Sequence, residues 1–315
     1  MVTTAVIGAG LMGHGIAQVL ASTPGIVWIH DVSQAALDEA IAQITESLDL
    51  LSRYGFIKEP AEVLGRIRTT PRLAEAVSDA WLIVEAATED LGIKQELFAN
   101  IEAESSRNAI IATNTSGLRL TDITTKVTHQ DRTVGSHFFM PAQVVPLVEV
   151  SRSKATSNQT MDTIVDHWEK CGKVPIRVER DIPGYVANRI QSALVREATA
   201  LLRDGVASAE DIDMAVRMSF GLRYLVSGPL EQRDLGGLDL HLAIGREMWP
   251  HLDTTAGPHA FVEKKVAKGE LGLKSGRGFY DWDGQDPETV RRNRTEALVS
   301  ALERLRTPPG RHAAR

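Results

Sequence analysis

The sequence predicts an α/β protein: a Rossmann-type, doubly wound and mostly parallel sheet, followed by an all-helical C-terminal domain. Up to about residue 180, short runs rich in Val and Ile alternate with amphipathic stretches, which is typical of crossover units in a parallel sheet. After Asp181 the strand candidates nearly vanish and helical patterns continue. A chain of 315 residues fits two domains, which we place at residues 1–182 and 183–315.

Seven segments of the first domain are predicted as strands, because each is a Val- and Ile-rich run bounded by Gly, Asn or charged residues. They are residues 5–7, 27–30, 82–85, 110–113, 133–136, 147–150 and 174–178. Between the second and third, apolar residues recur at spacings of four and three from Leu37 to Leu51, which predicts a helix. Another helix is expected after Asp90, which can cap it.

The second domain carries helix boundary signals. Pro183 and Gly184 mark its start, and Ser208 followed by Asp211 resembles a capping box. Asp286 and Pro287 suit the start of a terminal helix at about residue 287. That end of the chain is basic, which predicts a solvated helix face. Its charges are Arg291, Arg292, Arg294, Arg304, Arg306, Arg311 and Arg315 against Glu296 and Glu303.

Composition excludes several classes of protein. A net charge of −6 argues against a nucleic-acid partner. No run reaches the roughly 18 apolar residues of a membrane helix, and the N-terminus lacks a secretory signal, so we expect a cytoplasmic protein with no membrane partner. The single cysteine, Cys171, excludes an internal disulfide, and the nine scattered histidines suggest no metal site.

A glycine-rich loop follows the first strand and opens a helix: Gly8, Gly10 and Gly13 form a G-x-G-x-x-G pattern with Leu11 and Met12 inside it. In that context the pattern is typical of dinucleotide binding. The first glycine permits a tight turn, the second lets backbone approach a pyrophosphate, and the third allows close helix–strand packing. The amides at the start of the helix face the phosphates.

Asp31 ends the second strand, 18 residues after Gly13. A carboxylate there accepts hydrogen bonds from the adenosine ribose and repels a 2′-phosphate, which favours NAD over NADP as the cofactor. The alternative is a helix cap before Ser33.

Five further blocks, in order, resemble the L-3-hydroxyacyl-CoA dehydrogenase family. They are VEAATE (84–89), TNTS (113–116), HFFMP (137–141), LVEV (147–150) and PGYVANR (183–189). With KSGRGFY (274–280), the resemblance covers nearly the whole chain. It implies NAD-dependent oxidation of a small-molecule substrate, a place in fatty acid metabolism and a homodimer formed through the helical domain.

The resemblance implies a catalytic set. His137 matches the family's base, and Glu149, twelve residues later on the next strand, matches its partner carboxylate. A neutral imidazole suits proton removal near pH 7, and a carboxylate fixes its tautomer. Ser116 and Asn188 match residues that hydrogen-bond the substrate oxygen. Taken singly, His137 is typical of a core histidine, Ser116 of a turn residue, and Asn188 of a helix cap or a helix-packing amide.

Cofactor contacts are implied in the same way for residues beyond the glycine loop. They are Glu89, Lys94, Asn114, Ser116 and Lys274. Taken alone, Glu89, Lys94, Asn114 and Lys274 would each pass for a solvated surface residue.

Three features depart from the typical acyl-CoA enzymes. Met140 stands where the family has asparagine, and a thioether lacks an amide's donors and acceptors. Residues 51–68 are poor in lysine, whereas the typical enzymes carry a lysine-rich helical hairpin there that contacts CoA. Residues 221–231, with Arg223, resemble the branch of L-gulonate 3-dehydrogenase (the lambda-crystallin relatives) and carnitine dehydrogenase, whose substrates are free β-hydroxy acids. Arg223 could hold a substrate carboxylate, or be a surface arginine.

Three interpretations stay open. The first is an NAD-dependent dehydrogenase of short-chain L-3-hydroxyacyl-CoA. The second is a dehydrogenase of a free 3-hydroxy acid or polar β-hydroxy compound. The third is an NAD-binding structural protein without turnover, which the complete set of His137, Glu149, Ser116 and Asn188 disfavours.

Overall fold

The structure is a computed structural model that describes residues 2–304. These form two compact units. Unit 1 holds residues 2–188 and 295–303, and unit 2 holds residues 189–294 and 304. This grouping differs from the division expected at residue 182, because residues 183–188 and 295–303 join the sheet unit. Arg306, Arg311 and Arg315 of the basic end lie outside the described residues.

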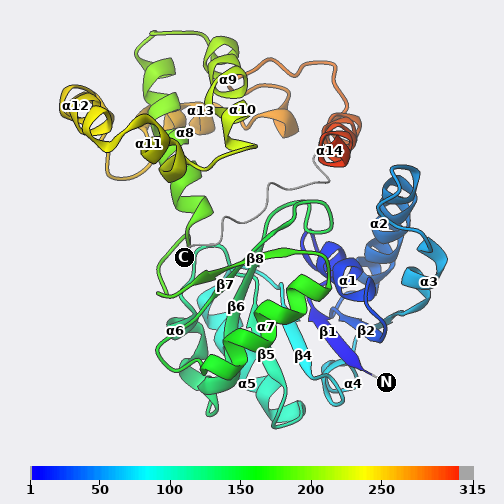
Figure 1. The fold of residues 1–315 in the computed structure, drawn as a ribbon. Helices are drawn as coiled ribbons and strands as arrows, with labels where there is room; N and C mark the ends of the chain where they lie inside the picture. Colours follow the sequence, from blue (N-terminus) through cyan, green and yellow to red (C-terminus); the bar gives the residue numbers. More distant parts are fainter. Residues whose placement is uncertain (1, 305–315) are drawn as a thin grey trace. The chain divides into compact units, whose positions relative to one another are not determined.

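Unit 1 is built on one eight-stranded sheet (Figure 1). Its strands are β1 (Thr3–Ile7), β2 (Ile26–His30), β3 (Ile67–Thr70), β4 (Leu82–Glu85), β5 (Ile110–Thr113), β6 (Thr133–Phe138), β7 (Leu147–Ser151) and β8 (Val174–Val178). Their spatial order is β3-β2-β1-β4-β5-β6-β7-β8. The chain runs outward from β1 to β3 on one side and then continues with β4 on the other side of β1, as in doubly wound folds. All neighbours pair in parallel except β6 and β7. The predicted fold class is confirmed.

Strand β3 was missed by the sequence analysis. It is four residues long, lies at the edge of the sheet, and carries only one aliphatic residue, Ile67, before Arg68 and two threonines. An edge strand contacts few neighbours, so it does not need the Val- and Ile-rich run by which the other strands were found.

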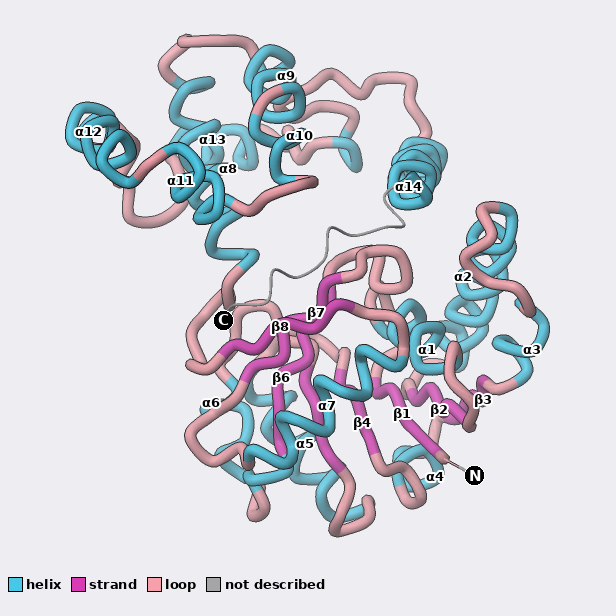
Figure 2. The backbone as a smooth tube through the Cα atoms, viewed as in Figure 1, coloured by secondary structure: helices cyan, strands magenta, loops and turns pink. Residues whose placement is uncertain are grey.

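Helices cover both faces of the sheet (Figure 2). They are α1 (Gly13–Ala21), α2 (Gln34–Arg53), α3 (Pro60–Gly65), α4 (Leu73–Val77), α5 (Leu91–Glu104), α6 (Leu120–Ile123) and α7 (Asn158–Lys170), with short 3₁₀ turns at Thr124–Lys126 and Gln130–Arg132. Alternate strand residues point to opposite faces. Val6 of β1 belongs to the core under α1, α2 and α7, whereas Ala5 and Ile7 belong to the core under α4, α5 and α6.

The predicted helix starts are confirmed by their caps. The Asp90 carboxylate accepts a hydrogen bond from the Ile93 amide at 2.9 Å and so caps α5. The Ser208 hydroxyl accepts from the Asp211 amide at 3.1 Å and caps α9. Both bonds satisfy an amide that the first helical turn leaves without a partner.

Helices and loops make up unit 2. The elements of this half are α8 (Ala187–Arg203), α9 (Ala209–Met218), α10 (Phe220–Tyr224), α11 (Pro229–Gly236), α12 (Leu238–Met248), α13 (Ala260–Ala267), α14 (Pro287–Arg304) and the 3₁₀ turns Trp249–His251 and Leu273–Ser275. In the described part of this half, β pairing is limited to isolated bridges around Arg277. Helix α8 begins in unit 1, and α14 returns to it. Within residues 2–304, no helix is both long and apolar enough to span a membrane.

Candidate active site

The glycine loop has the geometry that its sequence predicts. A Cβ on Gly8, which has φ +109°, would lie 2.6 Å from the Ala86 carbonyl oxygen, and one on Gly13 would lie 1.8 Å from the Gly8 oxygen. A Cβ on Gly10 would meet nothing within 4 Å, so open space lies above the loop. No side chain caps α1 at Met12, so its first-turn amides lack the usual side-chain acceptor. This loop fits a phosphate group.

Asp31 connects the end of β2 to that loop. Its Oδ2 accepts a hydrogen bond from the Ala9 amide at 3.0 Å, and its Oδ1 accepts one from the Ser33 amide at 3.0 Å. The N-cap of α2 is Ser33, whose hydroxyl accepts from the Ala36 amide at 3.3 Å, so Asp31 is not the helix cap of the alternative interpretation. Each oxygen still has a second lone pair that a ribose hydroxyl can use.

The structure brings His137 and Glu149 together. They lie on β6 and β7 and are directly opposite partners in the antiparallel register, so their side chains point to the same face. The His137 Nδ1 lies 2.8 Å from the Glu149 Oε2, and both residues are buried. When the carboxylate is ionised, Nδ1 carries the hydrogen of this bond. The free Nε2 then has the lone pair that a base requires.

The second oxygen of Glu149 is also occupied. Its Oε1 accepts hydrogen bonds from the Val186 amide at 2.9 Å and the Ala187 amide at 2.8 Å, at the start of α8. A helix N-terminus, with its unpaired backbone amides, is a favourable place for an acceptor. Glu149 thus has a donor on each oxygen, which compensates the cost of its burial.

Two aromatic rings enclose the His137 imidazole. The Phe139 ring centroid lies 4.7 Å from it in an edge-on arrangement, and the Tyr185 centroid lies 5.2 Å away. Tyr185 is itself buried and has φ +48°, an uncommon backbone conformation for a residue other than glycine. Burial raises the pKa of its hydroxyl, so Tyr185 stays neutral. The imidazole is therefore held by packing as well as by Glu149.

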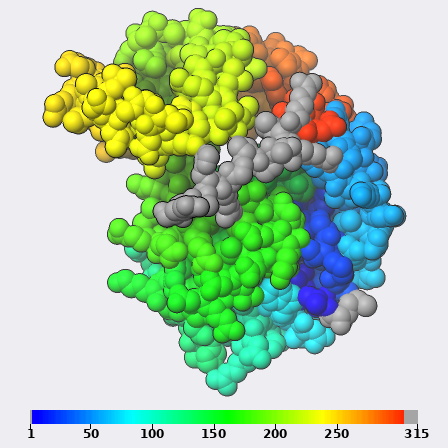
Figure 3. Space-filling model, in the orientation of Figure 1, coloured from blue at the N-terminus to red at the C-terminus, as the bar shows by residue number. Residues whose placement is uncertain are grey.

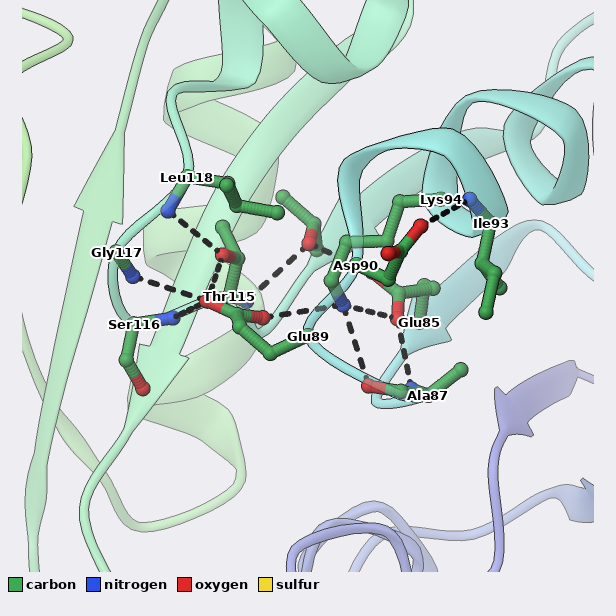
Figure 4. A network of polar contacts seen from close by, with 11 residues as sticks. Glu85, Ala87, Glu89, Asp90, Ile93, Lys94, Thr115, Ser116, Gly117 and Leu118 are labelled. Atoms are coloured by element: carbon green, nitrogen blue, oxygen red, sulfur yellow. Dashed lines mark hydrogen bonds and ion pairs between the residues drawn. The ribbon is translucent and has the colours of Figure 1, made fainter.

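A buried ion pair lies beside the strand ends (Figure 4). The Lys94 Nζ lies 2.5 Å from the Glu85 Oε1, and the two side chains are 1% and 0% exposed. Glu85 also accepts from the Thr113 hydroxyl at 2.7 Å and from the Ala87 amide at 2.7 Å. Lys94 is therefore not the solvated surface residue that its sequence alone would allow.

Glu89 extends this network to Ser116. Its Oε1 accepts from the amides of Ser116 and Gly117, each at 3.0 Å, and from the Thr115 hydroxyl at 2.5 Å. Burial alone would raise the pKa of Glu89, but these hydrogen bonds and the charge of Lys94 outweigh it and lower the pKa. Glu89 is therefore ionised at neutral pH. Figure 4 shows the Ser116 side chain directed away from Glu89.

The remaining predicted residues divide between the units. Asn114 is buried and its Oδ1 accepts from the Phe138 amide at 2.8 Å, so it connects β5 to β6. Asn188 is the second residue of α8 and lies in unit 1 with the dyad. Arg223 and Lys274 are exposed residues of unit 2.

Sequence reasoning named neither Glu85 nor Tyr185 as a functional residue. A signal for Glu85 was present: a carboxylate that ends an otherwise apolar strand must find a buried cation or donors. Tyr185 gave no such signal, because its position beside His137 depends on the chain returning to the sheet after β8. Among residues 2–304, no group of three or more His, Cys, Asp or Glu side chains is placed to hold a metal ion.

Two sequence families match the chain in succession. The 3-hydroxyacyl-CoA dehydrogenase NAD-binding domain matches residues 3–182, and the C-terminal domain of the same enzymes matches residues 184–282.

Individual relatives are similar over most of their length. A 5-formyl-3-hydroxy-2-methylpyridine 4-carboxylate 5-dehydrogenase of Mesorhizobium japonicum is 31% identical over 94% of this chain and 96% of its own. A 3-hydroxybutyryl-CoA dehydrogenase of Clostridioides difficile is 37% identical over 89% of this chain and 99% of its own. A crystal structure of a 5-formyl-3-hydroxy-2-methylpyridine 4-carboxylic acid 5-dehydrogenase, described as an NAD+-dependent dismutase, superposes with a TM-score of 0.91 at 30% identity, over 98% of this chain and 100% of the other.

The doubly wound sheet, its glycine loop and these matches define an NAD-dependent dehydrogenase. The chain belongs to the 3-hydroxyacyl-CoA dehydrogenase family.

Proposed function

We propose that this enzyme oxidises the C3 hydroxyl of a 3-hydroxy compound with NAD, using His137 as the base and Glu149 as its partner. The first candidate substrate is a short-chain L-3-hydroxyacyl-CoA, such as 3-hydroxybutyryl-CoA, which would give the 3-ketoacyl-CoA. The observation that carries the proposal is the 2.8 Å contact between His137 Nδ1 and Glu149 Oε2. The family of the chain and its dehydrogenase relatives support the reaction class.

The dyad accounts for the proton of the reaction. The C–H bond breaks with its electron pair, the O–H bond loses its proton, and the C–O bond becomes a carbonyl. NAD, when bound, accepts the hydride. His137 Nε2 takes the proton, and the imidazolium that forms keeps its Nδ1–H on Glu149. Because the ionised carboxylate lies against that positive charge, Glu149 stabilises the transition state more than the ground state.

Other residues of the proposed site hold substrate and cofactor. Ser116 and Asn188 would hydrogen-bond the C3 oxygen as negative charge develops on it. Glu89 would fix the Ser116 backbone for this role. The cofactor would be held by the glycine loop, Asp31, Glu89, Asn114, Ser116 and Lys274. Lys94 would contribute to cofactor binding indirectly, by holding the backbone at Ala87. Its Nζ donates to the Ala87 carbonyl oxygen at 3.3 Å.

A second candidate substrate is a free 3-hydroxy acid or polar β-hydroxy compound. Met140, 61% exposed, is a thioether where the typical acyl-CoA enzymes carry an amide. Residues 51–68 hold a single lysine, Lys58, whereas lysines are common partners of CoA phosphates. The Mesorhizobium relative is named for a pyridine carboxylate, not for a thioester. In this case Arg223 would bind the substrate carboxylate.

Parallel assays distinguish the two substrates. The purified enzyme is given NADH with either acetoacetyl-CoA or free acetoacetate, and the loss of NADH absorbance is followed. A thioester substrate predicts a higher kcat/KM for acetoacetyl-CoA, and a rate on the free acid that matches or exceeds it would exclude the first candidate. Failure to oxidise NADH with either compound would contradict the proposed function itself.

We also propose that unit 2 forms a homodimer interface. Large apolar side chains are exposed on its helices, and exposed apolar surface, where it is extensive, usually marks an interaction site. The most exposed on α11 and α12 are Leu230 and Leu235, at 82% and 77%. The family resemblance of the sequence implies a homodimer, so a second copy of the chain is the partner that we propose.

A further inference from the structure

Asp181 connects two segments of unit 1 that lie far apart in the sequence. It follows β8, and its carboxylate accepts hydrogen bonds from two backbone amides at the start of α6. The Oδ1 accepts from the Leu120 amide at 3.1 Å, and the Oδ2 accepts from the Thr121 amide at 2.8 Å. These partners are 61 and 60 residues away along the chain. Figure 1 shows α6 near the point where the chain leaves β8.

Helix α6 could be capped locally but is not. Its N-cap residue is Arg119, whose side chain gives the helix no cap and instead donates to the Asp122 carboxylate at 2.8 and 2.9 Å. A Ser, Asn or Asp at position 119 would satisfy a first-turn amide without any distant partner, whereas a contact that closes a long loop has to offset the entropy of ordering it. The carboxylate of Asp181 therefore also holds α6 to the segment after β8.

The segment before α6 carries Ser116. Ser116 and Gly117 are exposed, so burial of their side chains does not hold them. Their two amides donate to Glu89 Oε1, each at 3.0 Å. Four residues after Ser116, the Leu120 amide donates to Asp181. The backbone around Ser116 is thus held between two carboxylates.

The segment after β8, residues 179–186, ends at the dyad. The Tyr185 ring lies against the His137 imidazole, with centroids 5.2 Å apart, and the Val186 amide donates to Glu149 Oε1 at 2.9 Å. Strand β8 is at the edge of the sheet, and green atoms, the colour of α7 and β8, form much of the front surface of unit 1 in Figure 3. A segment that runs along the surface has few packing contacts, so its hydrogen bonds have a larger share in fixing its position.

We propose that Asp181 is a positioning residue: it holds Ser116 in place relative to the dyad, because it ties the start of α6 to the segment that ends on Glu149. The inference rests on the proposed function, in which Ser116 hydrogen-bonds the C3 oxygen while His137 takes the proton from it. Both groups have to reach the same oxygen, and a misplacement of about 1 Å can lower a rate by about a hundredfold. Asp181 itself takes no part in the bond changes.

Asp181→Ala removes both acceptors and tests this role. Ser157→Ala is the matched control, since the Ser157 hydroxyl caps α7 of the same unit by accepting from the Thr160 amide at 3.1 Å. For each protein, kcat is measured with NADH and either acetoacetyl-CoA or acetoacetate, whichever the wild type reduces faster, and NADH affinity is measured by titration calorimetry. Asp181→Ala should lower kcat by about tenfold and keep NADH affinity within about twofold, whereas Ser157→Ala should leave both within about twofold.

A double-mutant cycle shows whether Asp181 acts through Ser116. In a Ser116→Ala background the hydroxyl that has to be positioned is missing, so adding Asp181→Ala should lower kcat further by less than about twofold. Asp181→Asn keeps one side-chain oxygen as an acceptor. It should therefore lower kcat less than Asp181→Ala does, and it replaces that variant if Asp181→Ala does not fold.

A kcat within about twofold of the wild type in both Asp181 variants would overturn the inference, since the carboxylate would then be no more than a helix cap. Loss of NADH affinity in parallel with kcat would overturn it too, as would a further loss of about tenfold in the Ser116→Ala background, because Asp181 would then act independently of Ser116. A wild-type enzyme that reduces neither compound, or a Ser116→Ala variant with the kcat of the wild type, would instead contradict the proposed function.

Discussion

At the scale of single residues, the His137 ring has little freedom to reorient. Glu149 fixes its Nδ1, and Phe139 and Tyr185 lie beside the ring. A base positioned in this way does not have to be oriented during the reaction, which is the source of much of the rate advantage of an active site. The proposed chemistry therefore depends on the one nitrogen that remains free.

His137→Gln should lower kcat by about 10²–10⁴-fold, because glutamine has no basic nitrogen and general-base catalysis contributes about that factor. NAD affinity, measured by titration calorimetry, should stay within about twofold, because no part of the glycine loop is changed.

His251→Gln is a suitable control, since His251 is an exposed residue of unit 2. Near-normal turnover in His137→Gln would remove His137 from the mechanism.

At the scale of elements, a buried ammonium group helps to hold the β6–β7 loop, residues 139–146: the Lys173 Nζ donates to the Ala142 and Val145 carbonyl oxygens at 2.6 and 2.9 Å. Burial lowers the pKa of Lys173 to about 8, from the ordinary value of 10.5. Below pH 8 the side chain is charged in both the folded and the unfolded chain, and the folded state bears the full cost of its desolvation. Between pH 8 and 10.5 the folded side chain loses its proton while the unfolded one keeps it. The contribution of Lys173 to the free energy of unfolding therefore rises with pH in this window.

Comparison of the wild-type protein with Lys173→Met tests this. The difference between their free energies of unfolding, measured with urea at pH 7.5, 9 and 10, should shift in favour of the wild type as pH rises. Lys154→Met, at an exposed position, should show a constant difference. Parallel pH dependence of the wild type and Lys173→Met would contradict a depressed pKa at this position.

Most elements of unit 1 could be predicted because the signals that define them are local. Strands buried on both faces need runs of Val and Ile, and the caps at Asp90 and Ser208 need only the next turn of chain. The edge strand β3 does not need a run of Val and Ile, so its sequence carries no such signal and it was missed.

The site shows the same division. His137 and Glu149 were paired because the family resemblance of two blocks implies it, and the antiparallel register places them opposite each other. The Glu85–Lys94 ion pair was not predicted, since nine residues and a turn separate the two and nothing in their spacing requires them to meet. Tyr185 reaches His137 only through the path of the chain after β8. Contacts made by tertiary packing are thus the part that sequence reasoning did not supply.

At the scale of the whole molecule, the exposed apolar residues of unit 2 predict self-association. Light scattering after size exclusion should give twice the mass of one chain. Leu230→Glu should shift the population toward single chains, because burying a carboxylate at an apolar interface is costly.

Val2→Glu, at an exposed apolar position of unit 1, should leave the mass unchanged. A wild-type protein that elutes with the mass of one chain at micromolar concentration would contradict the dimer.

Glu149 has a part in both the proposed chemistry and the local path of the chain, since one oxygen meets the imidazole and the other meets the amides of Val186 and Ala187 at the start of α8. A redesign of this enzyme for a different reaction therefore cannot choose a replacement for Glu149 by its acidity alone. A replacement also removes the acceptor of the Val186 and Ala187 amides, where the chain enters α8. Random mutagenesis should therefore find new activities at Met140 far sooner than at Glu149.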